Sequence, residues 1–206
     1  MPEKGTINLH GSLLPHYRGA APINHVIING EKETGVTTFF LKQEIDTGDV
    51  IFSDTVTISD SETAGDLHDK LMAVGANLLV KTVKAIEANG YKEVPQIQSN
   101  SLKSAPKIFK EFCKIDWNNE TQLVYNHIRG LSPYPTAFTV FNDKTLKIFN
   151  AEPENIQPEI EPGAYLTDGK TYLKFATKNG FIKLTDVQLE GKKRMLIDEL
   201  LRGMRL

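Results

Sequence analysis

The strongest constraint on the fold is a change of pattern close to the middle of the chain. Up to about residue 92, strand-like runs lead into a long run with apolar residues at helical intervals. From about residue 108, short runs rich in β-branched and aromatic residues alternate with turn dipeptides. The stretch between them is polar and contains Pro95 and Pro106, which is typical of a linker. We therefore predict a first domain at 1–92, a linker at 93–107 and a second domain at 108–206.

The first domain has the pattern of an open α/β sheet. A strand ends at Leu9, and a helix follows at about 20–29, with Gly30 in the position that commonly caps helices. Two runs rich in Val, Ile, Thr and Phe, at 36–41 and 50–58, predict strands that pair as a hairpin.

A long amphipathic helix completes this domain. Ser59 and Glu62 have the spacing of a capping box, and the helix ends near Asn89 and Gly90. Three strands and two helices are too few to complete an open sheet, and they leave an edge exposed. We therefore expect a partial open α/β sheet, the C-terminal half of a Rossmann-like domain. The apolar positions predicted for the inner face of the helix are Leu67, Leu71, Val74, Leu78, Val83 and Ile86.

The second domain has the pattern of a small β-barrel. A short helix at about 120–130 precedes it, and another at about 196–201 ends it. Asn-Gly and Asp-Gly dipeptides between β runs are strong hairpin signals. The predicted strands are 137–141, 146–151, 172–176 and 182–189, and the predicted turns are Asn142-Asp143, Asp168-Gly169 and Asn179-Gly180.

The candidate site lies in the first fifty residues. Asn8 and His10 are separated by two positions, so in an extended segment both side chains point to one face. Asp46 lies in the turn between the two paired runs. An amide can stabilise a developing oxyanion, an imidazole can move a proton, and a carboxylate can orient the imidazole. Taken alone, Asp46 has the pattern of an ordinary acidic residue in a turn. The hypothesis of a catalytic site therefore depends on Asn8, His10 and Asp46 lying close together in the fold.

Two segments resemble the folate-dependent formyltransferases: Asn8-Leu9-His10-Gly11-Ser12-Leu13-Leu14-Pro15 and Asp46-Thr47-Gly48-Asp49. Members of that family have roughly a hundred further residues before this stretch, so we expect the chain to correspond to a family member that lacks them. The resemblance implies that the second domain is a barrel of the oligonucleotide-binding (OB) type. It assigns the catalytic set to Asn8, His10 and Asp46, and folate contacts to Ser12, Leu13, Leu14 and Pro15.

The resemblance also implies the substrates. The formyl donor would be 10-formyltetrahydrofolate, with no metal required, and members that carry an appended barrel formylate the amino group of initiator methionyl-tRNA. Two alternatives stay open: a sugar-nucleotide or other folate-dependent formyltransferase, and a fragment that binds RNA without catalysis. Whether His10 or a water molecule takes the proton of the amine is left open by the sequence.

The charge is distributed unevenly along the chain. Residues 1–100 contain 8 Lys and Arg against 13 Asp and Glu, whereas residues 101–206 contain 16 against 13. This modest positive excess is only weak evidence for nucleic acid as a partner, because most charge runs are solvated surface. The candidate tRNA contacts are Arg18, Arg129, Lys192, Lys193 and Arg194.

Composition excludes several classes of protein. No run of about twenty apolar residues is present and Met1-Pro2-Glu3-Lys4 does not begin a signal peptide, so we expect a cytoplasmic protein that does not enter a membrane. A single cysteine, Cys113, excludes an internal disulfide and a cysteine-based zinc cluster, and we expect it to be a small buried residue. The histidines have no metal-site spacing. We expect a monomer.

Overall fold

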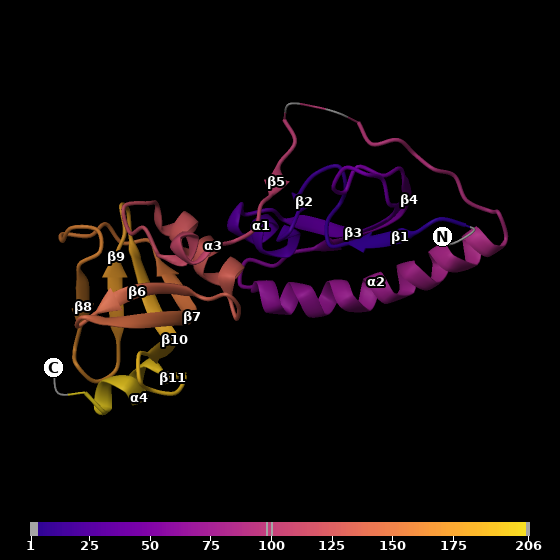
Figure 1. Ribbon diagram of the computed structural model, residues 1–206. Helices are drawn as coiled ribbons and strands as arrows, with labels where there is room; N and C mark the ends of the chain where they lie inside the picture. The colour runs from indigo at the N-terminus through magenta and orange to yellow at the C-terminus, as the bar shows by residue number, and fades with distance from the viewer. Residues whose placement is uncertain (1–3, 98, 100, 205–206) are drawn as a thin grey trace. The chain divides into compact units, whose positions relative to one another are not determined.

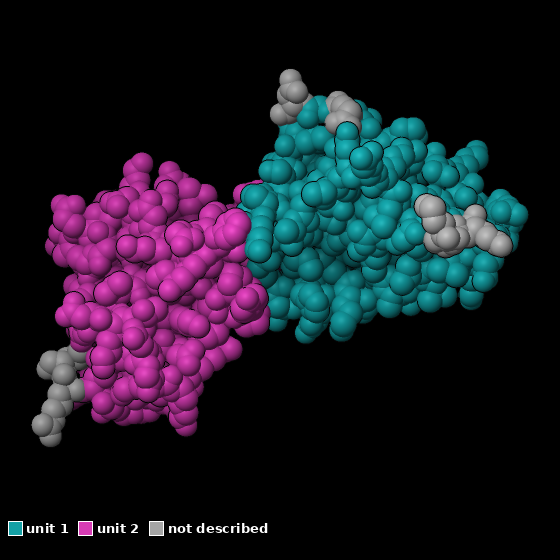
Figure 2. Space-filling model, in the orientation of Figure 1, with its two compact units in different colours: residues 1–26, 31–107 teal, residues 27–30, 108–206 magenta. Residues whose placement is uncertain are grey.

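The computed structural model describes residues 4–97, 99 and 101–204. The chain divides into two compact units, coloured separately in Figure 2. Unit 1 comprises residues 1–26 and 31–107, and unit 2 comprises residues 27–30 and 108–206. Among the described residues, no helix has the length and apolar character needed to span a membrane.

The sheet of unit 1 has the order β1-β3-β4, with both pairs antiparallel (Figure 1). The strands are β1 (Ile7–His10), β3 (Glu33–Phe40) and β4 (Val50–Thr57). β3 reads Glu-Thr-Gly-Val-Thr-Thr-Phe-Phe, and β-branched and aromatic side chains favour a pleated, half-buried surface. The predicted hairpin is confirmed, and β3 begins three residues before the predicted start.

Helix α2 (Ala64–Glu87) begins at a different cap from the one predicted. Thr63 is the N-cap: its hydroxyl accepts from the amide of Asp66 at 3.2 Å, and the Asp66 carboxylate accepts from the amide of Thr63 at 2.9 Å. The prediction of Ser59 and Glu62 as the capping box is wrong. Their bond, from the Ser59 amide to Glu62 Oε2 at 2.9 Å, closes the preceding turn instead. Both pairs satisfy the same spacing rule, so the rule alone does not choose between them.

Helix α2 packs on β3 and β4 and runs beside the sheet (Figure 1). Its inner face differs from the predicted one at Val83, whose side chain is 43% exposed. Gly75 takes an inner position, where an added Cβ would lie 2.8 Å from the Leu9 side chain of β1. The helix therefore comes close to β1 at this glycine. The buried residues of α2 are Ala64, Leu67, Leu71, Gly75, Leu78 and Thr82.

The remaining elements of unit 1 are short. Helix α1 (Pro22–Ile28) begins in unit 1, and its last two residues and Gly30 are counted in unit 2. Gly30 has a φ of +72°, which agrees with the predicted cap. Strand β2 (Arg18–Gly19) pairs in parallel with β5 (Ser104–Ala105), a pairing that the sequence did not predict. Val94 forms an antiparallel bridge with Val50. The stretch predicted as a linker thus lies against unit 1 at several points.

Unit 2 contains an antiparallel sheet of order β6-β7-β10-β9-β8, with β11 paired to β10. In the described part of the chain no pairing joins β8 back to β6, so the sheet is a half-barrel. The predicted combination of a partial α/β domain and a small barrel-type β domain is confirmed. The strands are β6 (Ala137–Phe141), β7 (Lys144–Glu154), β8 (Tyr165–Thr167), β9 (Leu173–Ala176), β10 (Phe181–Leu189) and β11 (Met195–Leu196), and the helices are η1 (Lys110–Cys113), α3 (Thr121–Leu131) and α4 (Ile197–Arg202).

The core of unit 2 is apolar and aromatic. The ring of Trp117 stacks on Phe175 with centroids 4.7 Å apart, and its Nε1–H donates to Thr139 at 3.0 Å. Asn142 and Asp143 both have positive φ, as a two-residue turn between β6 and β7 requires. Cys113 is 3% exposed, so its predicted burial is confirmed, and burial raises the pKa of its thiol. The packing of this unit thus follows the sequence pattern closely.

Candidate active site

His10 is the last residue of β1 and is buried, with 7% of its side chain exposed. Its Nε2 lies 2.8 Å from the carbonyl oxygen of Tyr17. Because a carbonyl oxygen only accepts, Nε2 carries the proton of this hydrogen bond. The other ring nitrogen, Nδ1, is therefore the one that can take a further proton.

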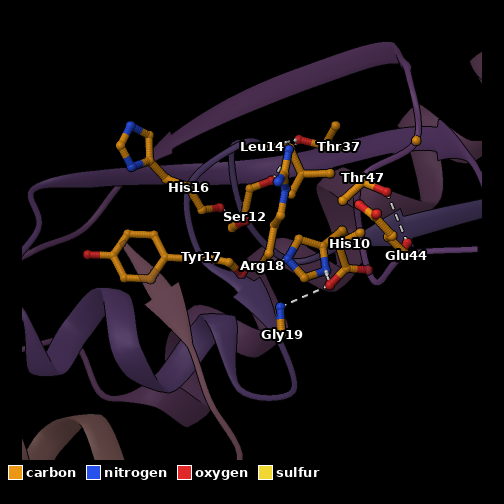
Figure 3. A network of polar contacts seen from close by, with 12 residues as sticks. His10, Ser12, Leu14, His16, Tyr17, Arg18, Gly19, Thr37, Glu44 and Thr47 are labelled. Atoms are coloured by element: carbon orange, nitrogen blue, oxygen red, sulfur yellow. Dashed lines mark hydrogen bonds and ion pairs between the residues drawn. The ribbon is translucent and has the colours of Figure 1, made fainter. Parts of the chain in front are cut away.

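Asp46 lies next to that second nitrogen. Its Oδ2 is 3.7 Å from His10 Nδ1, too long for a hydrogen bond but within the range of an ion pair. The same oxygen accepts from the Gly19 amide at 2.9 Å, the contact marked by the dashed line from the labelled Gly19 in Figure 3. The side chain of Asp46 is 11% exposed. Charges this poorly hydrated interact more strongly than they would in water. An imidazolium at His10 would be stabilised by Asp46.

Asn8 lies on the same strand as His10, two residues earlier, and pairs with Phe39 of β3. Alternation along a strand puts the side chains of Asn8 and His10 on one face of the sheet. Asn8 is half-buried. The structure therefore brings His10 and Asp46 into contact and puts Asn8 on the His10 side of β1.

The segment after His10 is fastened to β3 through Thr37. The Thr37 hydroxyl donates to the carbonyl of Ser12 at 2.7 Å and accepts from the Leu14 amide at 3.2 Å (Figure 3). The hydroxyl of Ser12, which is fully buried, donates to the carbonyl of His16 at 2.7 Å. Ser12 thus shapes the loop, while Leu13, Leu14 and Pro15 are half-buried.

A cavity of about 190 Å³ adjoins this loop. Tyr17 and Lys103 both donate to the carboxylate of Glu31 there. Burial raises the pKa of Glu31, but the hydrogen bonds from Lys103 and Tyr17 outweigh it, so the pKa lies below its ordinary value. Glu31 is therefore ionised at neutral pH and holds the Tyr17 side chain.

The five basic candidates lie in different environments. Arg18 is half-buried and donates twice to Gln96 Oε1, at 3.0 and 2.6 Å. Arg129 is 4% exposed and donates to Asn126 at 2.9 Å. Arg194 is exposed, but it binds both carboxylate oxygens of Asp186. Lys192 and Lys193 are exposed.

Sequence reasoning missed three groups that contact the His10–Asp46 pair or its loop. They are the Tyr17 carbonyl, the Gly19 amide and the Gln96 side chain, which donates to the carbonyl of Asp46 at 2.9 Å. Two of the three are backbone groups, which leave no side-chain signal. Within residues 4–97, 99 and 101–204, no group of three His, Cys, Asp or Glu side chains is placed to hold a metal ion.

Comparisons with known proteins identify the family of the two units. The formyl transferase family model matches residues 1–83, and the model of the formyl transferase C-terminal domain matches residues 107–205. The chain is 50% identical over 214 aligned positions to the methionyl-tRNA formyltransferase of Bacteroides fragilis, and 49% identical over 208 to that of Flavobacterium johnsoniae. These alignments cover 100% and 99% of this chain. The chain spans 66% of the length of each of these curated relatives.

Solved structures give the same result at lower identity. The N-formyltransferase from Helicobacter canadensis, in complex with folinic acid and dTDP-3-aminofucose, superposes with a TM-score of 0.70 and 25% identity. That match covers 86% of this chain and 64% of the other. The two family models together match almost the whole sequence, and the His10–Asp46 contact lies within the first of them. The chain belongs to the formyltransferase family.

Proposed function

We propose that the chain acts as a methionyl-tRNA formyltransferase, which formylates the amino group of initiator methionyl-tRNA in translation initiation, in the cytoplasm and as a monomer. The observation that carries the proposal is 50% identity to the Bacteroides fragilis enzyme over the whole of this chain. The chain spans only 66% of the length of that relative, so its formyl-transfer activity has to be tested directly. Residues 1–92 would hold the catalytic groups and residues 108–206 would bind the tRNA.

The chemistry needs two things from the protein. When the amine nitrogen attacks the formyl carbon, negative charge develops on the formyl oxygen, and Asn8 donates a hydrogen bond to it. The amine loses a proton, and His10 accepts it at Nδ1. The other ring nitrogen, Nε2, already carries a proton, which it donates to the Tyr17 carbonyl. Asp46 stabilises the resulting imidazolium. The bond from the formyl carbon to the donor nitrogen then breaks, and that nitrogen takes up the proton that His10 accepted.

The formyl group would come from 10-formyltetrahydrofolate. Leu13, Leu14 and Pro15 begin three residues after His10, are half-buried and are apolar, which suits the flat ring system of a folate. The Ser12 side chain is used internally, so its contribution is the shape of the loop. The Helicobacter canadensis relative contains folinic acid, which supports a folate in this family.

Of the five basic candidates for tRNA contact, the two exposed lysines, Lys192 and Lys193, fit best. Lys192 and Lys193 are free of the carboxylate contact that occupies Arg194, and Arg129 is too buried to reach a phosphate without rearrangement. Arg18 lies close to the Asp46 loop through Gln96 and could contact only the acceptor end. We therefore assign the salt-dependent part of the affinity to Lys192 and Lys193.

The catalytic proposal is tested by formyl transfer from 10-formyltetrahydrofolate to initiator methionyl-tRNA. The chain is assayed beside a hybrid that adds the residues present in the Bacteroides fragilis relative and not in this sequence. His10→Ala should lower kcat by about 10²- to 10⁴-fold, the usual range for a lost general base, while tRNA affinity changes less than twofold. His68→Ala, at an exposed histidine of α2, is the matched control and should change neither. An equal loss of tRNA affinity and rate in His10→Ala would contradict the catalytic role.

The tRNA contacts are tested by titrating tRNA at rising salt. Replacing Lys192 and Lys193 together by Gln should lower affinity at low salt and reduce the slope of log affinity against log salt by about 2. Lys183→Gln is the control, because Lys183 is exposed in the same unit but pairs with Glu152 at 3.2 Å. An unchanged slope in the double variant would show that the two lysines are only solvated charge.

A sugar-nucleotide acceptor is the second candidate. It is favoured by the structural match to the Helicobacter canadensis enzyme, whose complex contains dTDP-3-aminofucose. The same assay with an amino-sugar nucleotide in place of the tRNA distinguishes the two acceptors. Turnover of the nucleotide alone would replace the first proposal, and tRNA binding without turnover of either acceptor would indicate an RNA-binding role.

A further inference from the structure

Four residues beyond α2 hold the loops that carry the candidate catalytic groups. They are Gln96, Lys103, Ser104 and Ala105, and we call them the anchor residues. The sequence placed them in a linker. In the structure they contact the chain at residues 17–19 and 46–48, on both sides of the His10–Asp46 pair.

The first anchor is the side chain of Gln96. Its Nε2 donates to the carbonyl oxygens of Asp46 at 2.9 Å and of Gly48 at 2.7 Å. Its Oε1 accepts from Arg18 at Nε and Nη2, at 3.0 and 2.6 Å. One primary amide thereby joins the Asp46 loop to the loop after His10. Of the side chains of this length, only glutamine offers two donors at one end and an accepting oxygen beside them.

The second anchor is the backbone of residues 103–105. The carbonyl of Lys103 accepts from the Tyr17 amide at 2.6 Å, and Ser104 and Ala105 pair in parallel with Arg18 and Gly19. These contacts fix two groups that touch the pair directly. The Tyr17 carbonyl accepts from His10, and the Gly19 amide donates to Asp46.

The backbone at these loops is held in conformations that need support. Tyr17 has a φ of +61° and Asp46 a φ of +53°, a region that costs a side-chain-bearing residue about 1–2 kcal/mol. Such conformations persist when surrounding contacts determine them. Gln96 supplies contacts to the Asp46 loop, and Lys103 and Glu31 supply contacts to Tyr17.

We propose that Gln96 is a positioning residue for formyl transfer, which sets the separation of His10 and Asp46 by joining the two loops. The effect of Gln96 on the rate of formyl transfer rests on the proposed function, whereas its effect on the His10–Asp46 separation does not. His10 Nδ1 and Asp46 Oδ2 are 3.7 Å apart, so a small shift of the Asp46 loop removes the stabilisation of an imidazolium. Misplacement by about 1 Å costs up to roughly 100-fold in rate.

Two variants separate positioning from simple packing. Gln96→Leu removes the donors and the acceptor. Gln96→Glu keeps the size and still accepts from Arg18, but it cannot donate to Asp46 and Gly48. If Gln96 served only as packing or as a partner for Arg18, Gln96→Glu would behave like the wild type. The matched control is Gln188→Leu in unit 2, where the side-chain amide also donates to a backbone carbonyl, that of Lys192 at 3.1 Å.

The first measurement needs no activity. Nitrogen-15 NMR of the His10 ring in the 206-residue chain should show the proton on Nε2, and both Gln96 variants should shift the Nδ1 signal, because the Asp46 carboxylate beside it moves. Gln188→Leu should keep the wild-type signals. Unchanged His10 signals in both Gln96 variants would overturn the proposal, whatever the assay finds.

The second measurement is the formyl-transfer assay. Both Gln96 variants should lower kcat by roughly 10- to 100-fold with the KM for donor and acceptor within about twofold. A wild-type value of kcat in Gln96→Glu overturns the positioning role. If the wild type transfers no formyl group, the proposed function fails while the NMR result still decides whether Gln96 sets the His10–Asp46 geometry.

Discussion

The candidate active site of unit 1 and the core of unit 2 keep their shape by different means. In unit 2, aromatic and aliphatic side chains from regular strands and helices form one apolar cluster around residues such as Phe175, Phe141 and Leu184. In unit 1, the loops that hold His10 and Asp46 depend on hydrogen bonds between side chains and backbone groups distant in sequence. Each such bond contributes about 1 kcal/mol net, less than one buried aromatic ring.

The difference follows from the groups that each region holds. His10 and Asp46 are polar and poorly exposed, and the backbone beside them has positive φ at Tyr17 and at Asp46 itself. Irregular backbone has no repeating hydrogen-bond ladder, so single side chains must satisfy it. A core has no such requirement, because apolar contacts are not directional.

The largest effect is expected from Phe175→Ala. Phe175 is 2% exposed and stacks on Trp117, so the substitution should lower the free energy of unfolding of unit 2 by about 3–5 kcal/mol. Urea unfolding followed by the fluorescence of Trp117, the single tryptophan, measures it. The His10 ring signals in unit 1 should not change below the unfolding transition. A parallel loss of those signals would show that the two regions are not independent.

The control for this substitution is Val140→Ala in the same sheet. Val140 is 57% exposed, so its effect should stay within about 0.5 kcal/mol. A loss at Val140 as large as that at Phe175 would mean that burial is not what stabilises unit 2.

Replacing one glycine in each unit by alanine should have a smaller effect on stability, but it should distinguish the two units more sharply. Gly19 has a φ of +125° and Gly191 a φ of +79°, so alanine is strained at both. A Cβ on Gly19 would collide with the carbonyl oxygen of Ala105, whereas nothing lies within 4 Å of one on Gly191. Gly191→Ala should therefore cost about 1–2 kcal/mol, and Gly19→Ala should add the loss of the β2–β5 pairing.

Hydrogen exchange of the Tyr17 amide, which donates to Lys103, reports that pairing directly. Exchange should accelerate in Gly19→Ala and stay at the wild-type rate in Gly191→Ala. Equal exchange in the two variants would show that strain in φ, and not the contact with Ala105, controls the loop.

Much of the fold could be predicted because the buried face of a helix or strand makes apolar residues recur at regular intervals in the sequence. The hairpin of β3 and β4, the long helix and four strands of unit 2 were found from alternation and turn dipeptides. Errors occurred where two local signals competed, as with Ser59 and Thr63, or where a residue outside the apolar pattern, Gly75, takes an inner position. The short strands β2 and β5 contain two residues each and leave no period.

The candidate site could be predicted in its residues but not in its support. Asn8, His10 and Asp46 were found from a motif, and the structure brings His10 and Asp46 to 3.7 Å. Gln96 lies in a polar run that resembles any linker, and its partners Arg18 and Asp46 are 78 and 50 residues away. No local rule connects positions so far apart.

The sequence by itself determined the types of the main elements, the change from an α/β pattern to a β pattern, and the motif that contains the candidate catalytic residues. These features depend on residues that are neighbours in the chain or repeat at fixed intervals, so they can be read without coordinates. Only the tertiary structure decided that residues of the expected linker, Gln96 and Lys103–Ala105, hold the loops of His10 and Asp46. The physical reason is that a hydrogen bond to a backbone carbonyl depends on where the chain has folded, and any carbonyl in the sequence could have accepted it.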